Sequence, residues 1–287
     1  MTLKSLPGVV FVILLLLPAA YLPAQTLTTW NVRILSDKSR DDSELDKIAS
    51  IIEQSDFVAL QEVRDSRVLA RLMDRLEGWD YILSLPAGRG VKEFYAYLYR
   101  TELFEVLGAP YSLNDYEDLF IREPYIAHFR CGTFDFTIVT MHSIYGDKKA
   151  LRRAEAALLD DVIAYVDEEN GPEADVILTG DFNLPGDDGA WEMEPYRYLV
   201  PSDVKTTISD ASSYDNIWIS TATTEVMTDI SLYAFDEILF GNDDKTASRE
   251  VSDHRPVSIE IRSNLPDDDE EGDWDYPDRL IPSLRIE

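Results

Sequence analysis

The sequence is poor in cysteine and in positive charge. Cys131 is the single cysteine among 287 residues, so no disulfide can form within the chain and the fold must be held together by its core. Lysine and arginine number 26 against 55 aspartates and glutamates, a formal net charge of −29. This balance excludes a nucleic-acid-binding protein that relies on a broad basic face. It leaves room for an enzyme that contacts a phosphate over a small area with the help of metal ions.

A long apolar run is also missing. The apolar stretch 9–17 follows the lone charge of Lys4 and is too short to cross a bilayer comfortably. Its length and the small residues after it are typical of a secretory signal. We therefore predict that residues 1–25 are a signal peptide, cleaved between Ala20 and Gln25, and that the protein is secreted or periplasmic. An uncleaved membrane anchor is the alternative.

Strand-like and helix-like segments alternate from residue 26 onward. Apolar residues at helical spacing predict helices at 41–54, 65–76 and 147–169. Short apolar or alternating runs predict strands, at 26–35, 57–63, 94–100, 125–131, 134–141, 175–178, 216–219 and 257–261. This order predicts an α/β fold, a four-layer sandwich of two packed mixed sheets flanked by helices. No linker interrupts it, so we expect one domain at 26–264 and a solvated acidic tail at 265–287.

Polar clusters stand where predicted strands end, the edge at which α/β sheets collect reactive groups. The residues are Asn31, Glu62, Arg64, His142, Asp181, Asn183, Asp253 and His254. Their carboxylate and amide oxygens suit Mg²⁺ or Mn²⁺, and no cysteine–histidine spacing suits zinc. Each cluster alone is compatible with a plain turn, because Gly, Asp and Asn are turn formers. Their combination, with two of the chain's three histidines among them, favours a functional site over plain turns.

The motifs TTWNVR, LQEVRD, TGDFN and SDHRP occur here in an order that resembles the endonuclease/exonuclease/phosphatase superfamily. The resemblance runs from about residue 26 to 261. It implies a two-sheet α/β sandwich that hydrolyses phosphodiesters or phosphomonoesters with a divalent metal. The ion implied is Mg²⁺, with Mn²⁺ as an alternative and Ca²⁺ as a structural or co-activating ion.

The resemblance also implies a role for each matching residue. Glu62 matches the metal-binding glutamate, Asp253 a second acidic ligand, and Asn31 an asparagine that supports the metal or the phosphate. Asp181 and Asn183 match the pair that orients the attacking water and the phosphate oxygens.

Two histidines match catalytic positions of the superfamily, each with a carboxylate partner. His254 matches the histidine that contacts the scissile phosphate, and Asp215 the carboxylate that holds it. His142 stands where the deoxyribonuclease I, toxin-nuclease and sphingomyelinase branches carry histidine and the abasic-site repair branch tends to carry tyrosine. Glu93 lines up with the partner of that histidine in deoxyribonuclease I.

Arginines near the clusters resemble substrate-binding residues of deoxyribonuclease I. Arg122 is similar to its phosphate-contacting arginine, and Arg64 to its minor-groove arginine. The sequence departs from that enzyme at Val91, where an aromatic stacks on deoxyribose, and its disulfides are absent. A further basic cluster is interpreted as a solvated helix face, with a nucleic-acid contact as the alternative; it comprises Lys148, Lys149, Arg152 and Arg153.

Together these features predict an exported, monomeric endonuclease that cleaves DNA with little sequence preference and needs no stable protein partner. A sphingomyelinase-like or phosphoinositide-phosphatase-like hydrolase of the same fold is the first alternative. A non-catalytic binding module on this scaffold is the second, but it requires lost catalytic residues and none of the core set is missing.

Overall fold

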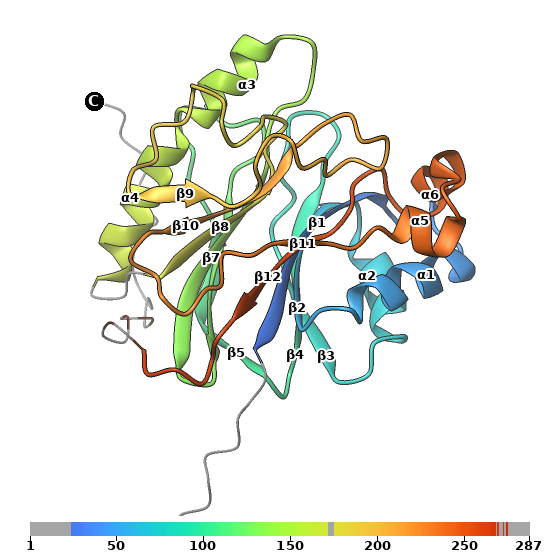
Figure 1. Ribbon diagram of the computed structural model, residues 1–287, viewed down its shortest axis with the longest axis horizontal. Helices are drawn as coiled ribbons and strands as arrows, with labels where there is room; N and C mark the ends of the chain where they lie inside the picture. Colours follow the sequence, from blue (N-terminus) through green and yellow to red (C-terminus); the bar gives the residue numbers. More distant parts are fainter. Residues whose placement is uncertain (1–23, 172–174, 268, 270–271, 273, 275–287) are drawn as a thin grey trace, which may run out of the picture.

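The computed structural model describes residues 24–171, 175–267, 269, 272 and 274 (Figure 1). The predicted signal peptide lies almost wholly outside these residues, and so does most of the predicted acidic tail. Within the described part of the chain, no helix has the length and apolar character needed to cross a membrane.

Twelve strands within the described residues form two six-stranded sheets. The first sheet has the order β11-β12-β1-β2-β4-β3, with β11 Ser231–Leu232, β12 Val257–Ile261, β1 Gln25–Leu35, β2 Phe57–Val63, β4 Phe94–Arg100 and β3 Trp79–Leu83. The second has the order β5-β6-β7-β8-β10-β9, with β5 Phe104–Ser112, β6 Tyr125–Cys131, β7 Phe134–His142, β8 Val176–Asp181, β10 Asp215–Ser220 and β9 Tyr196–Tyr198. Both sheets are mixed, because β1 is parallel to β2 and β7 to β8 whereas the other pairs are antiparallel.

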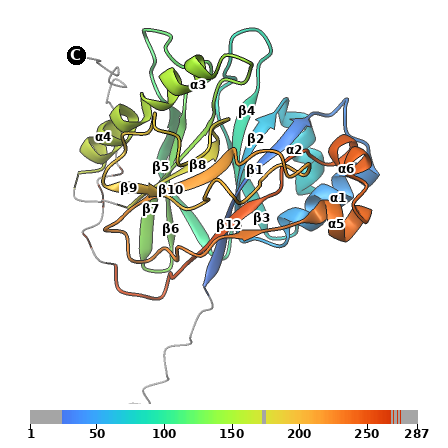
Figure 2. The same ribbon diagram turned by 45° about the horizontal axis from the view of Figure 1, so that its top comes forward.

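Helices cover the outer face of each sheet (Figures 1 and 2). Beside the first sheet lie α1 Asp42–Ile52, α2 Ser66–Met73, α5 Phe235–Phe240 and α6 Asp244–Glu250, and beside the second lies α4 Leu159–Asn170. Helix α3 Lys149–Ala156 stands over the loops at the end of the second sheet (Figure 1). The first helix begins at a capping box, in which Asp41 accepts from the Glu44 N–H and Glu44 reaches back to the Asp41 N–H.

Side chains of β2 show how the layers pack. Phe57 and Ala59 point into the core between the sheets, whereas Val58 and Leu60 point into the core beneath the helices. Phe57 meets Phe129 of the facing sheet edge-on, with ring centroids 4.8 Å apart. A third core lies between the second sheet and α4. Three cores separate four layers, so the predicted α/β sandwich is confirmed.

The structure corrects the predicted helix 147–169, which is two helices with a break at 157–158. No glycine or proline marks the break, so the helical periodicity could not reveal it. Four strands and two helices were not predicted at all: β3, β5, β9, β11, α5 and α6. Within the segment expected to be a solvated tail, Trp274 is 8% exposed and packs on His128, with ring centroids 4.4 Å apart.

Candidate active site

The structure brings the eleven sequence-predicted site residues to one place. Glu93 and Asp215 are fully buried behind a cleft of about 540 Å³. The other nine line that cleft: Asn31, Glu62, Arg64, Arg122, His142, Asp181, Asn183, Asp253 and His254. Glu62, His142 and Asp181 lie at the carboxyl ends of β2, β7 and β8. Asp253 and His254 instead precede β12, so the expectation that every polar cluster follows a strand is wrong for this motif.

An irregular stretch of β1 shapes one wall of the cleft. The pairing of β1 with β2 shifts register between Asn31 and Leu35, and Arg33 and Ile34 adopt left-handed backbone angles there. This turns the Ile34 N–H toward Glu62, whose Oε2 accepts from it at 3.0 Å. Glu62 is itself left-handed, with φ 63°. Non-glycine residues in this region cost of order 1–3 kcal/mol each and gather at functional sites.

Asp181 lies at the centre of the constellation. Its Oδ2 accepts from Asn31 Nδ2 at 2.9 Å and lies 3.7 Å from the Nε2 atoms of both His142 and His254. Its Oδ1 accepts from the Asn183 N–H at 3.0 Å, which closes the turn after β8. One carboxylate thus faces two imidazoles that reach the cleft from opposite sheets.

Each imidazole is held from behind by a buried carboxylate. His142 Nδ1 lies 3.0 Å from Glu93 Oε1, and His254 Nδ1 lies 2.8 Å from Asp215 Oδ2. A carboxylate at Nδ1 favours the tautomer with its proton there, and this leaves Nε2 to act in the cleft. These two histidine–carboxylate pairs are the pairs that the resemblance implied.

The surroundings of the two imidazoles shift their pKa values in opposite directions. Burial lowers the pKa of His142 to about 4, although Asp181 opposes the shift. Burial also opposes charge on His254, but Asp215 and Asp181 outweigh it and raise its pKa to about 10. At Glu62, burial favours the neutral acid, yet His142 and hydrogen bonds from neighbouring residues hold its pKa below its usual value. The cleft therefore places one neutral and one protonated imidazole near the ionised carboxylate of Glu62.

The side-chain atoms of the cleft that could ligate a metal fit a hard divalent cation. The Asn31 amide donates to Glu62 Oε1 at 3.2 Å and to Asp181 Oδ2 at 2.9 Å, so oxygens of both carboxylates lie around one point. Two acid and histidine groups have ligand atoms close enough to share an ion, Glu62–Glu93–His142 and Asp181–Asp215–His254. Oxygen ligands of this kind suit Mg²⁺ or Mn²⁺. Asp253 belongs to neither group: its half-exposed carboxylate lies 3.6 Å from Arg33 Nε.

The two predicted substrate-binding arginines lie in the wall of the cleft. Arg64 donates to Glu62 Oε2 at 3.0 Å and lies 3.6 Å from Glu93. Arg122 also contacts Glu93 and donates to the His142 carbonyl at 3.2 Å. Both side chains are under one-fifth exposed, so their guanidinium groups face the carboxylates of the site.

Helix α3 contributes one residue, Glu155, that sequence reasoning missed as part of the site. Glu155 is 4% exposed, and its carboxylate accepts from the N–H groups of Ile121 at 2.8 Å and Ile144 at 2.6 Å. It thereby joins the loop of Arg122 to the loop after His142. The one sequence signal was a glutamate among alanines in the helix that follows the histidine.

The basic cluster at the start of α3 is largely the predicted solvated face, since Lys148, Lys149 and Arg153 are exposed and only Arg152 is partly buried. Lys149 and Arg153 both pair with Asp188, each at 2.8 Å. Arg152 donates to the Asn183 carbonyl at 2.9 Å and lies over the Tyr214 ring in the cleft wall. Three of the four cations therefore hold the loops around the site in place.

Comparisons with known proteins agree with this geometry. The family model described as Endonuclease/Exonuclease/phosphatase family matches residues 28–254. A deoxyribonuclease of Thioalkalivibrio sp. (strain K90mix) is 33% identical over 275 residues, covering 88% of this chain and 75% of its own length. Human deoxyribonuclease-1 is 29% identical and covers 82% of this chain and 92% of its own length.

Solved structures share the fold at lower sequence identity. Truncated Caenorhabditis elegans TDP2 has a TM-score of 0.62 at 17% identity, covering 83% of this chain and 98% of its own. The mannosyl-6-phosphatase Bt3783 of Bacteroides thetaiotaomicron has a TM-score of 0.58 at 19% identity, covering 83% and 99%. At these identities the likeness bears on the fold alone.

Proposed function

Because the chain belongs to the endonuclease/exonuclease/phosphatase family, we propose that it is an exported, divalent-metal-dependent endonuclease that hydrolyses DNA with little sequence preference. Family membership makes it a phosphodiester-hydrolysing enzyme, and DNA is our inference for its substrate. The relatives named deoxyribonuclease support this choice, since they align over more than four-fifths of the chain. The observation that carries the chemistry is Asp181 Oδ2, which lies 3.7 Å from two carboxylate-backed imidazoles.

The cleft supplies the groups that such a hydrolysis needs. A divalent ion held by Glu62 and Asp181, with Asn31 supporting both carboxylates, would neutralise charge that builds on the phosphate. Asp181 accepts the proton of a water and orients its lone pair toward phosphorus. We keep Asp253 as a further candidate ligand, because it lines the same cleft.

The two imidazoles move protons and bind phosphate oxygens. His142 and His254 present Nε2 to the cleft while Glu93 and Asp215 fix their rings. General acid–base catalysis by positioned groups of this kind contributes about 10²–10⁴-fold to a rate. Arg122 lies beside His142 and offers its charge to a neighbouring phosphate of the strand.

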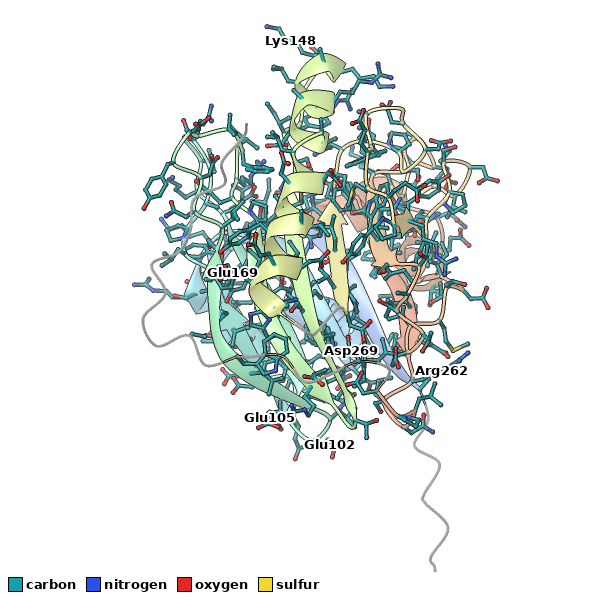
Figure 3. All side chains as sticks on the ribbon, turned by 90° about the vertical axis from the view of Figure 1, so that its left-hand side faces the viewer. Glu102, Glu105, Lys148, Glu169, Arg262 and Asp269 are labelled. Atoms are coloured by element: carbon teal, nitrogen blue, oxygen red, sulfur yellow. The ribbon has the colours of Figure 1, made fainter. Side chains whose placement is uncertain are left out.

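Plasmid nicking by the purified protein tests the proposal. With Mg²⁺ or Mn²⁺ we expect supercoiled DNA to be converted to open circles, and we expect EDTA to abolish this. His254→Ala and Asp181→Ala should each lower the rate by about 10²-fold or more, since each removes a group that touches the reacting atoms. Glu105→Ala is the matched control, because this exposed residue of β5 lies at the far end of the molecule (Figure 3).

Parallel substrates separate the alternatives. Release of choline phosphate from sphingomyelin, or of phosphate from a phosphoinositide, without any nicking of DNA would overturn the DNA assignment while keeping a metal-dependent phosphoester hydrolase. Full nicking activity in His254→Ala or in EDTA would overturn the proposed mechanism. Export is tested separately, by sequencing the N-terminus of the protein recovered outside the cytoplasm.

A further inference from the structure

A smaller hollow lies beside the catalytic cleft and shares a wall with it. Its volume is about 200 Å³, and residues of the segment 144–152, which joins β7 to the first turn of α3, line it. Tyr145 lines both this side hollow and the cleft. Arg152 also connects the two, because it lines the hollow and donates to the Asn183 carbonyl in the cleft wall at 2.9 Å. A DNA strand whose scissile phosphate lies in the cleft can therefore extend into the side hollow.

Two large apolar side chains of the side hollow are exposed to solvent. Tyr145 is 74% exposed and Leu151 is 49% exposed, so neither is packed into one of the three cores. Apolar side chains that are exposed together around a hollow mark a binding site, whereas a single exposed one does not. A nucleobase has flat apolar faces, and it stacks on an aromatic ring whatever its identity. The side hollow therefore suits a base of a DNA strand, with little preference for sequence.

The side hollow also carries positive charge, which is scarce on this protein. Lys148 and Arg152 line it together with one acid, Asp147. Lys148 is exposed, and Figure 3 shows it at the top of α3. Lys149 beside it is paired with Asp188, whereas Lys148 forms no ion pair within the described part of the chain. Proteins that bind single-stranded DNA combine aromatic rings for the bases with cations for the backbone, and this hollow offers both.

The rest of the cleft gives a DNA duplex little to hold. Arg64 and Arg122 are less than one-fifth exposed and face the carboxylates of Glu62 and Glu93. Duplex DNA carries one negative charge per about 1.7 Å of its axis, and proteins bind it by neutralising many of its phosphates. A chain with a formal net charge of −29 repels that density of charge over a broad face. The bases of a duplex are also stacked on one another, so Tyr145 can reach the face of a base only when that base is unpaired.

We propose that Tyr145 and Leu151 hold an unpaired base near the scissile phosphate, and that the enzyme therefore prefers single-stranded to duplex DNA. Lys148 binds the phosphate beside that base. The inference rests on the DNA hydrolysis proposed above and specifies which form of DNA this chain accepts. Tyr145 determines the preference without taking part in proton transfer, because the groups that move protons, such as Asp181 and His254, are buried whereas its ring is exposed.

Cleavage of one short oligonucleotide, offered as a single strand and as a duplex with Mg²⁺, tests the preference. The unaltered protein should have the higher kcat/KM on the single strand. Tyr145→Ala should raise KM for the single strand about 10-fold, the effect of losing one stacked base, with little change in kcat, whereas Tyr145→Phe should keep the ring and the KM. Tyr116→Ala is the matched control, since Tyr116 is 76% exposed and is not among the residues that line the cleft or the side hollow. Equal cleavage of both forms of DNA, unaffected by Tyr145→Ala, would overturn the inference and leave the proposed endonuclease intact.

Substrates that lack a single base locate the contact. One nucleotide at a time is replaced by an abasic residue along the single strand. In the unaltered protein KM should rise about 10-fold when the missing base lies at one fixed distance from the cut, and in Tyr145→Ala this dependence on position should disappear. A dependence on position that persists in Tyr145→Ala would assign the base to another residue and refute the proposal.

Binding separates this inference from the proposed hydrolysis. In the His254→Ala protein with Mg²⁺, the anisotropy of a fluorescent single-stranded oligonucleotide measures the Kd without cleavage. Adding Tyr145→Ala should raise the Kd about 10-fold, and adding Lys148→Ala should lower the slope of log Kd against log salt by about 0.7, the value for one phosphate of a single strand. Lys245→Ala, which removes an exposed lysine of α6, should change neither. DNA that is bound in this way but not cleaved by the unaltered protein would overturn the hydrolysis and support the base contact. Absent binding, or binding that Tyr145→Ala does not weaken, would overturn the base contact.

Discussion

Glu155 offers the sharpest test of how the fold builds the cleft. Its carboxylate accepts from the Ile121 and Ile144 N–H groups, and burial raises its pKa while these two donors oppose the shift. In Glu155→Gln one oxygen remains as an acceptor, but the amide nitrogen faces the other N–H group. A buried donor left without its charged acceptor costs about 1–3 kcal/mol, and we expect a loss of stability of that size. For a chain of this length the corresponding fall in Tm is about 2–10 °C.

The effect on catalysis should exceed the effect on folding. Glu155 touches neither metal nor substrate; it is a positioning residue for the loops that carry Arg122 and follow His142. A displacement of about 1 Å in such groups costs up to about 10²-fold in rate. We therefore expect Glu155→Gln to lower kcat for plasmid nicking by about 10-fold or more, with a smaller change in KM.

Assays well below the Tm of the variant separate positioning from unfolding. Glu123→Gln is the control, because it makes the same change one residue after Arg122 at a partly exposed position. If Glu155→Gln lost stability but kept the kcat of the unaltered protein, Glu155 would be a structural residue only. If it lost neither, the two hydrogen bonds would not matter and our reading of the loops would be wrong.

Two further predictions follow from the histidines. Asp215→Asn should lower the nicking rate by about 10²-fold or more, since the amide no longer holds the Nδ1 proton of His254, and an unchanged rate would contradict the pairing. Burial lowers the pKa of His128 to about 4, so below about 6.5 the unfolded chain binds a proton that the folded one does not. Stability should therefore fall as pH drops from about 6.5 to about 4, by about 3 kcal/mol from this residue. The free energy of unfolding, measured with urea at several pH values, should depend less steeply on pH in His128→Asn than in the unaltered protein. An equal dependence on pH in the two proteins would refute the argument.

The local pattern of apolar and polar residues was enough to predict the fold class and most of the strands. The predicted strands 57–63, 94–100 and 125–131 match β2, β4 and β6 residue for residue. These strands are continuous apolar or alternating runs between turn formers, and such runs are short-range signals. The reactive clusters were found for the same reason, because each stands directly beside one of these runs: most follow a strand, whereas Asp253 and His254 precede β12.

Elements without such a signal were missed. The edge strands β3, β5 and β9 are partly exposed and carry charged residues, so their apolar pattern is weak. The break between α3 and α4 has no glycine or proline. The packing of α3 over the loops and of α4 over the sheet decides where the break falls, and no local sequence pattern predicts either contact.

The candidate site, like the fold, could be predicted from the sequence only in part. The sequence placed His142 and Asp181 at the ends of strands and His254 just before a strand, but only the packing of the two sheets brings Asp181 within 3.7 Å of both imidazoles. The same is true of Glu155 beneath two loops. Likewise, the acidic segment after β12, predicted to be solvated, meets Asp135 and Asp175 only because the chain returns to the sheet. Contacts between residues far apart in the chain depend on how whole layers pack, and no periodicity within one segment encodes them.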